Sequence, residues 1–185
     1  GPACAAAKPS GVPAKSNDDY YRHAFAAIDA VKPDLAETLA ARGPDPILNK
    51  VLRGYAMALP GNSYSFSELN AFIQKNPNWP GLKGIQMIAE QKIPEGVPPP
   101  QLIEWFTQRP PVTLAGFYRF VDALSRSGLE ETAQKAVRRR WVEGDFTGNE
   151  QTAFYARFGS WLNDGDLWAR TDRLLWKNDK NLVRR

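Results

Sequence analysis

Residues 113–141 read TLAGFYRFVDALSRSGLEETAQKAVRRRW, and this segment decides the fold. Apolar side chains recur every three or four positions on both sides of Gly128, which is the period of an amphipathic helix. Thr113 is a favoured residue at the start of a helix, and glycine is favoured just past the end of one. The segment therefore predicts two helices joined by a tight turn.

The following segment repeats this pattern. Phe117 and Phe154 lie 37 residues apart (154 − 117), and Gly128 and Gly165 have the same offset (165 − 128). Helical hairpins that recur at a fixed period are typical of an α-solenoid, in which each hairpin buries its apolar face against the next. The offset lies between the tetratricopeptide period of about 34 and the HEAT or armadillo period of about 40.

The rest of the chain extends this pattern towards both ends. Proline and glycine clusters separate short segments of helical period, and no segment alternates with the period of a strand. Ser65 and Glu68 have the spacing of a capping box at one helix start. We therefore expect an all-α protein, an α-α superhelix (solenoid) of about ten short antiparallel helices.

Composition divides the 185 residues into three regions. Residues 1–16 are small and polar, which predicts a disordered tail; its Gly1-Pro2 resembles the remnant of a cleaved tag. Residues 17–178 form the predicted superhelical domain, and residues 179–185 a C-terminal tail. We expect the core to include Phe25, Leu52, Phe72, Ile85, Trp105, Phe106, Phe117, Leu124, Val137, Trp141, Phe154, Trp161, Leu174 and Trp176.

The last predicted helix, residues 166–178, carries more large apolar residues than one inner face can bury. At about 100° per residue, Leu174 and Leu175 point in different directions, and Trp168 lies about 240° from Leu174. We expect part of this surface to be exposed and to mediate self-association, or to be covered by a further hairpin in a longer protein. Alternatively, residues 177–185 fold back over it.

Few residues suited to catalysis or to metal binding are present. The chain has one histidine and one cysteine, so neither a histidine–cysteine metal site nor a disulfide framework is expected, and no nucleotide-binding glycine motif occurs. We interpret His23 as a surface residue or a hydrogen-bonded residue within a helix, and Glu130-Glu131 as acidic residues that offset a helix dipole. The sequence therefore predicts no catalytic, cofactor-binding or metal-binding residues, and no cofactor.

Charge and hydropathy limit the partners. The formal net charge is +4, a mild excess that suits an anionic partner. Arg138, Arg139 and Arg140 are consecutive, so on a helix they cannot form one patch, and we expect one of them to pair with a neighbouring hairpin. Basic and acidic residues interleave and no long apolar segment occurs, so we expect neither a nucleic-acid partner nor a transmembrane segment.

Three motifs carry a resemblance to a known family. Residues 72–81 read FIQKNPNWPG, residues 138–141 read RRRW, and residues 166–176 read DLWARTDRLLW. Together they resemble the N-terminal superhelical (U-shaped) domain of soluble lytic murein transglycosylases, over about residues 18–178. One departure is Leu167, where the family pattern has a histidine that is not catalytic.

The resemblance implies a function in the cell wall. Enzymes of this family cleave the MurNAc–GlcNAc bond of peptidoglycan to 1,6-anhydro products, using the glutamate of a Glu-Ser-x-Phe motif followed by Gly-Leu-Met-Gln. Neither motif is present: Ser67-Glu68 has the reverse order, and Glu104 precedes Trp105 instead of a serine. The resemblance therefore implies a non-catalytic, periplasmic scaffold whose partners are glycan strands and a separate catalytic domain.

Two alternatives stay open at this point. The chain is either the scaffold region of such an enzyme, truncated before the catalytic domain, or a standalone solenoid adaptor that binds a protein or peptide on its concave face. Whether the whole protein is an enzyme is equally open. Cys4 follows a small residue as in a lipid-attachment motif, so a lipid anchor there is a further possibility.

Overall fold

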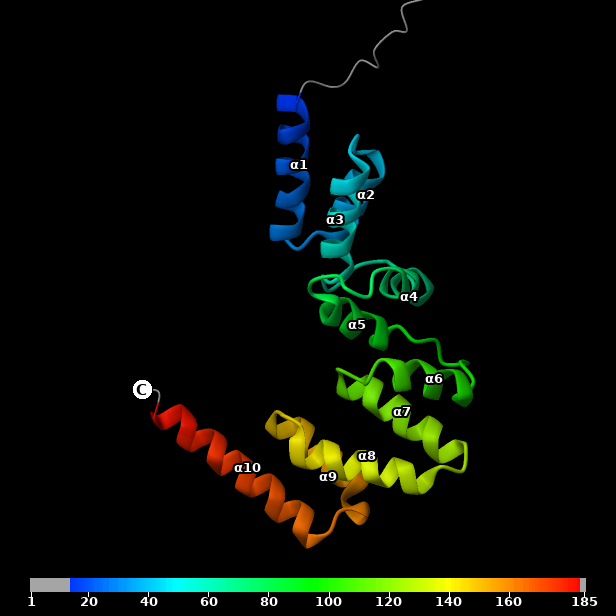
Figure 1. Cartoon of the computed structure of the whole chain (residues 1–185), viewed down its shortest axis with the longest axis vertical. Helices are drawn as coiled ribbons and strands as arrows, with labels where there is room; N and C mark the ends of the chain where they lie inside the picture. The colour runs from blue at the N-terminus through cyan, green and yellow to red at the C-terminus, as the bar shows by residue number, and fades with distance from the viewer. Residues whose placement is uncertain (1–13, 184–185) are drawn as a thin grey trace, which may run out of the picture. The chain divides into compact units, whose positions relative to one another are not determined.

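The computed structural model describes the backbone of residues 14–183 and the side chains of residues 17–178 (Figure 1). This part of the chain contains ten α-helices, one short 3₁₀ turn and no strand. The prediction of an all-α protein is confirmed. The chain divides into two compact units after Glu95. Residues 1–13 of the predicted tail, with the lipid anchor considered at Cys4, lie outside the described residues. The predicted boundary at residue 16 is wrong, because residues 14–16 form the start of the first helix.

The N-terminal unit has five helices: α1 (Ala14–Asp29), α2 (Pro33–Arg42), α3 (Pro46–Met57), α4 (Phe66–Lys75) and α5 (Leu82–Gln91). Helix α1 packs on α2 and α3, α3 packs on α2 and α5, and α4 packs on α5. Neighbours in sequence are therefore mostly neighbours in space, as in a helical repeat.

Helix starts in this unit follow the sequence signals. The Asp45 side chain accepts hydrogen bonds from the N–H groups of Ile47 and Leu48 at the start of α3. Ser65 Oγ accepts from the N–H of Glu68 at 3.1 Å, which forms the serine half of the predicted capping box. These contacts satisfy N–H groups that have no partner within the helix.

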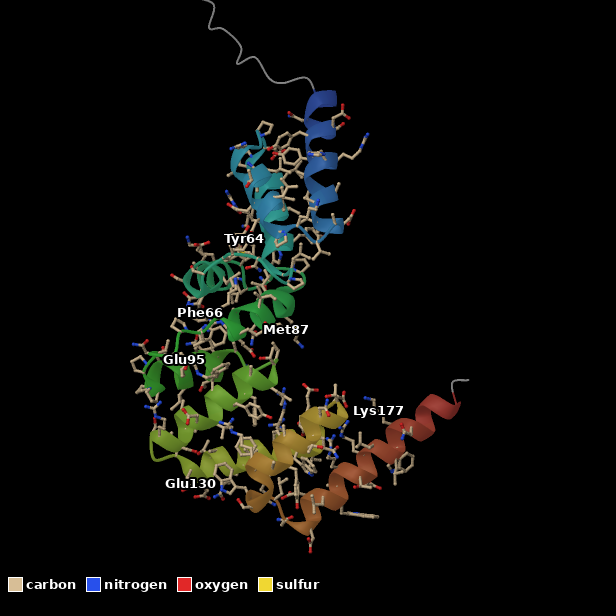
Figure 2. All side chains as sticks on the ribbon, turned by 180° about the vertical axis from the view of Figure 1, so that it is seen from behind. Tyr64, Phe66, Met87, Glu95, Glu130 and Lys177 are labelled. Carbon is tan, nitrogen blue, oxygen red and sulfur yellow. The ribbon has the colours of Figure 1, made fainter. Side chains whose placement is uncertain are left out.

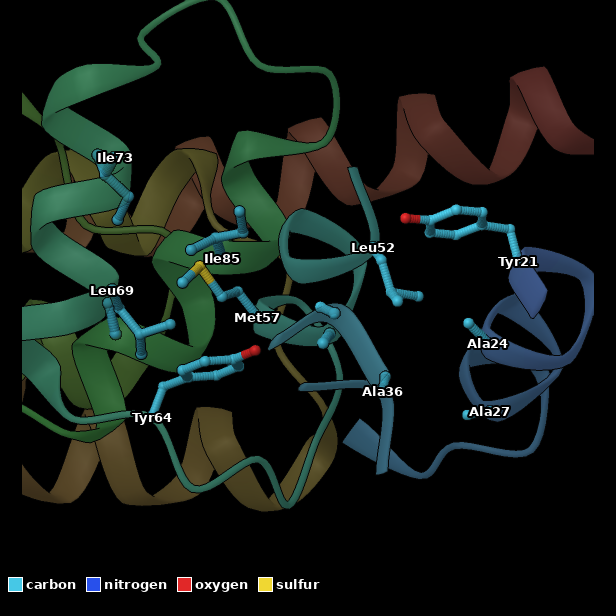
Figure 3. Close-up of a cluster of buried hydrophobic side chains, with 13 residues drawn as sticks. Tyr21, Ala24, Ala27, Ala36, Leu52, Met57, Tyr64, Leu69, Ile73 and Ile85 are labelled. Atoms are coloured by element: carbon cyan, nitrogen blue, oxygen red, sulfur yellow. The ribbon is translucent and has the colours of Figure 1, made fainter. Parts of the chain in front are cut away.

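Small side chains dominate the core of the N-terminal unit (Figure 3). Six alanines on α1, α2, α3 and α5 are buried in the same core as Leu52. Gly54 allows a close approach, because a Cβ atom there would lie 2.3 Å from the indole ring of Trp79. Gly54 therefore makes room for the Trp79 ring, and the small alanine side chains allow neighbouring helices to approach closely.

The C-terminal unit also has five helices: α6 (Pro99–Gln108), α7 (Leu114–Arg126), α8 (Glu130–Glu143), α9 (Gly148–Phe158) and α10 (Asp164–Val183), with the 3₁₀ turn Gly159–Trp161 before α10. Helix α7 packs on α6 and α8, and α10 lies beside α8. Figure 1 shows the carboxyl end of α10 extending away from α8 and α9. Helix α10 continues past residue 178, where the sequence predicted a tail.

Equivalent positions of the predicted repeat meet in the core. The rings of Phe117 on α7 and Phe154 on α9 are stacked with centroids 6.0 Å apart. The glycines, in contrast, are not equivalent. Gly128 has φ +75° in the turn before α8, whereas Gly165 lies within the first turn of α10 and does not have a positive φ. The two phenylalanines of the predicted repeat thus share one core, but the two glycines differ in turn geometry.

Most predicted core residues are buried, but one prediction is wrong. Trp176 is 63% exposed, because it lies on the side of α10 that faces away from α8. Partly buried positions are Phe25, Phe72, Trp161 and Leu174. Buried positions are Leu52, Ile85, Trp105, Phe106, Phe117, Leu124, Val137, Trp141 and Phe154.

Candidate interaction surface

Helix α10 is attached to the rest of its unit by a buried arginine. Arg170 is 4% exposed, and its Nη1 donates to the carbonyls of Trp141 at 2.9 Å and Gly144 at 2.8 Å. Its Nε and Nη2 donate to Oε1 of Gln151 on α9, at 3.1 and 2.9 Å. The two carbonyls end α8, where the helix dipole is negative. Arg170 therefore holds α8, α9 and α10 together.

The Arg170 guanidinium is also enclosed by aromatic rings. Its central carbon lies 4.9 Å from the ring centroid of Trp141 and 4.6 Å from that of Phe146. Burial, with the nearby charge of Arg173, lowers the pKa of the Arg170 guanidinium. The hydrogen bonds to three oxygen acceptors and the ring faces stabilise this buried charge.

Asp166 holds the start of α10. Its carboxylate accepts hydrogen bonds from the N–H of Asn163 and from Nε of Arg138 on α8, both at 2.9 Å. In return Asn163 Oδ1 accepts from the N–H of Asp166 at 2.9 Å. Burial raises the pKa of the Asp166 carboxyl, but the hydrogen bonds from Arg138 and Asn163 outweigh it, so the pKa lies below its usual value.

A second ion pair lies further along α10. Arg173 Nη1 and Lys177 Nζ lie 3.3 and 3.1 Å from Oδ1 of Asp145, in the loop after α8. Hydrogen bonds from Lys177 and Arg173 lower the pKa of the Asp145 carboxyl. Figure 2 labels Lys177 on this helix. Charged side chains of α10 thus form ion pairs on the side of the helix that faces α8 and the loop after it.

The opposite side of α10 is apolar and exposed. Trp168, Leu175 and Trp176 are 68%, 55% and 63% exposed, and we call these three residues the α10 outer face. At about 100° per residue, Leu175 and Trp176 lie about 20° and 80° from Trp168 around the helix axis. The prediction that residues 166–178 expose apolar surface is confirmed.

A cavity adjoins the α10 outer face. It has a volume of about 220 Å³ and lies among residues of α8, α9 and α10, with Leu174 and Leu175 in its wall. Leu175 therefore belongs to both the cavity wall and the exposed face. Trp141 also lines this cavity, and its buried indole N–H has no hydrogen-bond partner in the described part of the chain.

The three consecutive arginines have separate partners. Arg138 pairs with Asp166 of the next hairpin, and Arg139 pairs with Glu143 on the same helix at 3.1 Å. Arg140 donates to the carbonyl of Pro111 at 3.2 Å. The predictions that they form no single patch and that one of them pairs with a neighbouring hairpin are confirmed.

The acid and base candidates from the sequence lie apart on exposed helix surfaces. His23 is exposed on α1, Glu104 on α6, and Glu130 and Glu131 in the first turn of α8. Within the side chains that the structure describes, no group of three histidine, cysteine or acidic residues is placed to hold a metal ion. None of the helices in the described range combines the length and apolar character needed to cross a membrane.

Neither a family model, nor a curated protein, nor a solved structure matches this chain. Arguments about function therefore depend on the residues and their geometry. Sequence reasoning predicted exposed apolar surface on residues 166–178, but it placed Trp176 of the α10 outer face in the core. It also missed Asp145 and the role of Arg170, since both depend on which helices pack together.

Proposed function

We propose that the chain is a non-catalytic helical scaffold, the superhelical region of a periplasmic lytic transglycosylase. In this role it contacts peptidoglycan glycan strands and supports a catalytic domain, which performs the cleavage to 1,6-anhydro products. The resemblance of the three sequence motifs is the basis for naming this family, and the contacts of the motif residues support it.

The observation that carries the proposal is that two separate motifs meet. Arg138 and Trp141 come from the RRRW motif, and Asp166 and Arg170 come from the motif at residues 166–176. Arg138 binds Asp166, and Arg170 binds the Trp141 carbonyl and covers its ring. Residues that serve only to join two helices are what a scaffold motif requires, whereas a catalytic motif would leave a reactive group accessible.

The α10 outer face supplies a surface for the supported domain. Two exposed tryptophans lie on this helix face beside an exposed leucine, and tryptophan is among the side chains that most often contribute binding energy at interfaces. Adjacent apolar side chains exposed to water are a common mark of an interaction site. In the proposed scaffold, this face contacts the catalytic domain.

Incubation with purified sacculi tests the proposal. The chain should co-sediment with sacculi and release no 1,6-anhydromuropeptides, measured by mass spectrometry against a boiled-protein control. Failure to bind sacculi would contradict the scaffold function. Release of anhydro products would reveal an acid or base that we have not identified, and Glu104 and Glu130 would be the first residues to change.

A solenoid adaptor is the second candidate function. The α10 outer face favours it equally, because an adaptor also needs an exposed apolar contact. An adaptor without a cell-wall role would not co-sediment with sacculi, yet it would retain a protein partner. Replacing Trp168, Leu175 and Trp176 by serine would abolish partner binding, whereas serine at Leu35, Ile47 and Tyr55, which are exposed on the N-terminal unit, is the matched control.

A further inference from the structure

A larger cavity lies in the N-terminal unit, against α3 and α4, with a volume of about 540 Å³. Pockets for small organic ligands measure about 300–1,000 Å³. Its wall contains the apolar side chains of Met57 and Phe72 and the charged side chains of Lys50, Arg53 and Lys75. The proposed scaffold function makes no use of this cavity.

A hydrogen-bonded chain of three side chains holds one arginine in the cavity wall. Tyr64, labelled in Figures 2 and 3, is buried and donates its hydroxyl hydrogen to Oε2 of Glu37. Arg53 Nε donates to both oxygens of Glu37, at 3.2 and 3.0 Å. Burial, with the hydrogen bond to Glu37, raises the pKa of Tyr64, so the hydroxyl remains a donor at neutral pH.

This arrangement leaves part of Arg53 available. Only its Nε is used, and its two terminal nitrogens make no hydrogen bond to any residue that the structure describes. A guanidinium fixed through one nitrogen presents its remaining N–H groups in the planar geometry that binds a carboxylate or a phosphate.

Further positive charge surrounds Arg53. Lys50 and Lys75 also line the cavity, and neither forms an ion pair within the described residues. Lys50 Nζ lies 5.9 Å from the ring centroid of Trp79. The lining contains two carboxylates, and Glu37 already accepts hydrogen bonds from Arg53 and Tyr64. Glu68 is therefore the one remaining negative charge in the lining, against the two positive charges of Lys50 and Lys75.

We propose that this cavity binds a small organic oxyanion, a carboxylate or phosphate carried on an apolar body. The terminal nitrogens of Arg53 hold the oxyanion, and Lys50 and Lys75 attract it. Met57 and Phe72 contact the apolar body. The site goes beyond the scaffold function and does not depend on it, because its lining belongs to the N-terminal unit alone.

Amide chemical shifts of the whole chain test the site during titration with four probes: 3-phenylpropionate, phenyl phosphate, acetate and inorganic phosphate. We expect saturable shifts confined to α3 and α4 with the two phenyl probes. The probe that binds more tightly identifies the oxyanion. Acetate and inorganic phosphate should bind at least about fivefold more weakly, since they lack the apolar body. The uncharged 3-phenylpropanamide should not bind.

Three variants assign the roles of the cations. Arg53→Lys keeps the charge beside Glu37 but loses the planar donors, so it should weaken binding by about tenfold. A double variant with Lys50→Gln and Lys75→Gln should weaken binding of the probe by about threefold. The pair Lys32→Gln and Lys83→Gln removes the same charge from exposed positions outside the cavity lining and should change nothing.

Several results would overturn the proposal. One is the absence of saturable shifts in the wild type at about 10 mM of either phenyl probe, a concentration at which even a weak site is occupied. Another is equal binding of 3-phenylpropanamide, which would mean that charge is not recognised. If the two double-lysine variants bound the phenyl probes with equal affinity, Lys50 and Lys75 would not attract the ligand. A spectrum of each unliganded variant confirms that it folds.

Discussion

The cores of the two units differ in side-chain size. In the N-terminal unit, alanines such as Ala24, Ala36 and Ala56 are fully buried, so helices approach closely. In the C-terminal unit, Phe154 lies at the centre of a cluster of rings and has Phe117 stacked 6.0 Å away. Small buried side chains therefore characterise the first core, whereas large rings and the buried guanidinium of Arg170 characterise the second. The two units should therefore respond differently to substitution and to pH.

The largest expected effect is the loss of the central ring. Phe154→Ala should destabilise the C-terminal unit by about 3–5 kcal/mol, because it removes a fully buried ring and leaves a cavity. Leu52→Ala is the counterpart in the N-terminal unit. It should cost less than Phe154→Ala, within the range of about 2–5 kcal/mol for a buried leucine, since a smaller group is lost. Urea unfolding of both variants measures the difference. If Leu52→Ala lowered the free energy of unfolding more than Phe154→Ala did, the proposed difference between the two cores would be wrong.

Next in size is the loss of the buried charge. Arg170→Met should cost about 2–3 kcal/mol, because it leaves buried carbonyl groups without a donor. Arg170→Lys should recover little, since one ammonium group cannot replace the planar donors.

Thermal unfolding of both Arg170 variants provides the measurement. Arg139→Met is the matched control, and it should change stability by less than about 0.5 kcal/mol, because the Arg139–Glu143 pair is exposed. Equal effects of Arg170→Met and Arg139→Met would mean that Arg170 does not hold the unit together.

A smaller effect should depend on pH. The pKa of Asp166 is lower in the folded protein, so its ionised form stabilises the C-terminal unit at neutral pH. This contribution is complete above the usual pKa of about 4 and is lost as the pH falls through the lower, folded-state pKa. Asp166→Asn should therefore cost about 1 kcal/mol at pH 7, and this cost should decrease progressively below about pH 4.

Urea unfolding of the wild type and Asp166→Asn across this pH range measures the effect. Asp122→Asn serves as a control, because Asp122 pairs with Arg126 at the surface at 3.7 Å. An unchanged cost of Asp166→Asn at low pH would show that the carboxylate charge is not what stabilises the start of α10.

The smallest effect should be weak self-association through the α10 outer face. Three exposed side chains provide less area than the roughly 800 Å² per partner of a stable interface, so dimers should form only at high concentration. Sedimentation should show that Leu175→Ser with Trp176→Ser abolishes them, while Ile47→Ser with Tyr55→Ser does not. A monomeric wild type whose Trp176 is shielded from a soluble quencher would contradict this prediction.

Local signals account for much of what the sequence predicted. The all-α class, the helical hairpins and most of the core follow from apolar period and from residues such as Ser65 and Gly128, which act within a few positions of the chain. The sequence also predicted that the last helix exposes apolar surface, because one helix face cannot bury all of its large apolar residues, although it did not identify Trp176 as exposed.

Only the tertiary structure decided how distant residues meet. Helix α10 packs on α8 with the side that carries Arg170, so Arg170 is buried and Trp176 is exposed. The apolar period of the sequence could not predict which side of the helix would pack, since it suggested that the tryptophan rather than the arginine is buried. The Glu37–Arg53–Tyr64 chain joins residues 16 and 27 positions apart in sequence. Such contacts depend on the packing of whole helices, and no local sequence signal specifies that packing.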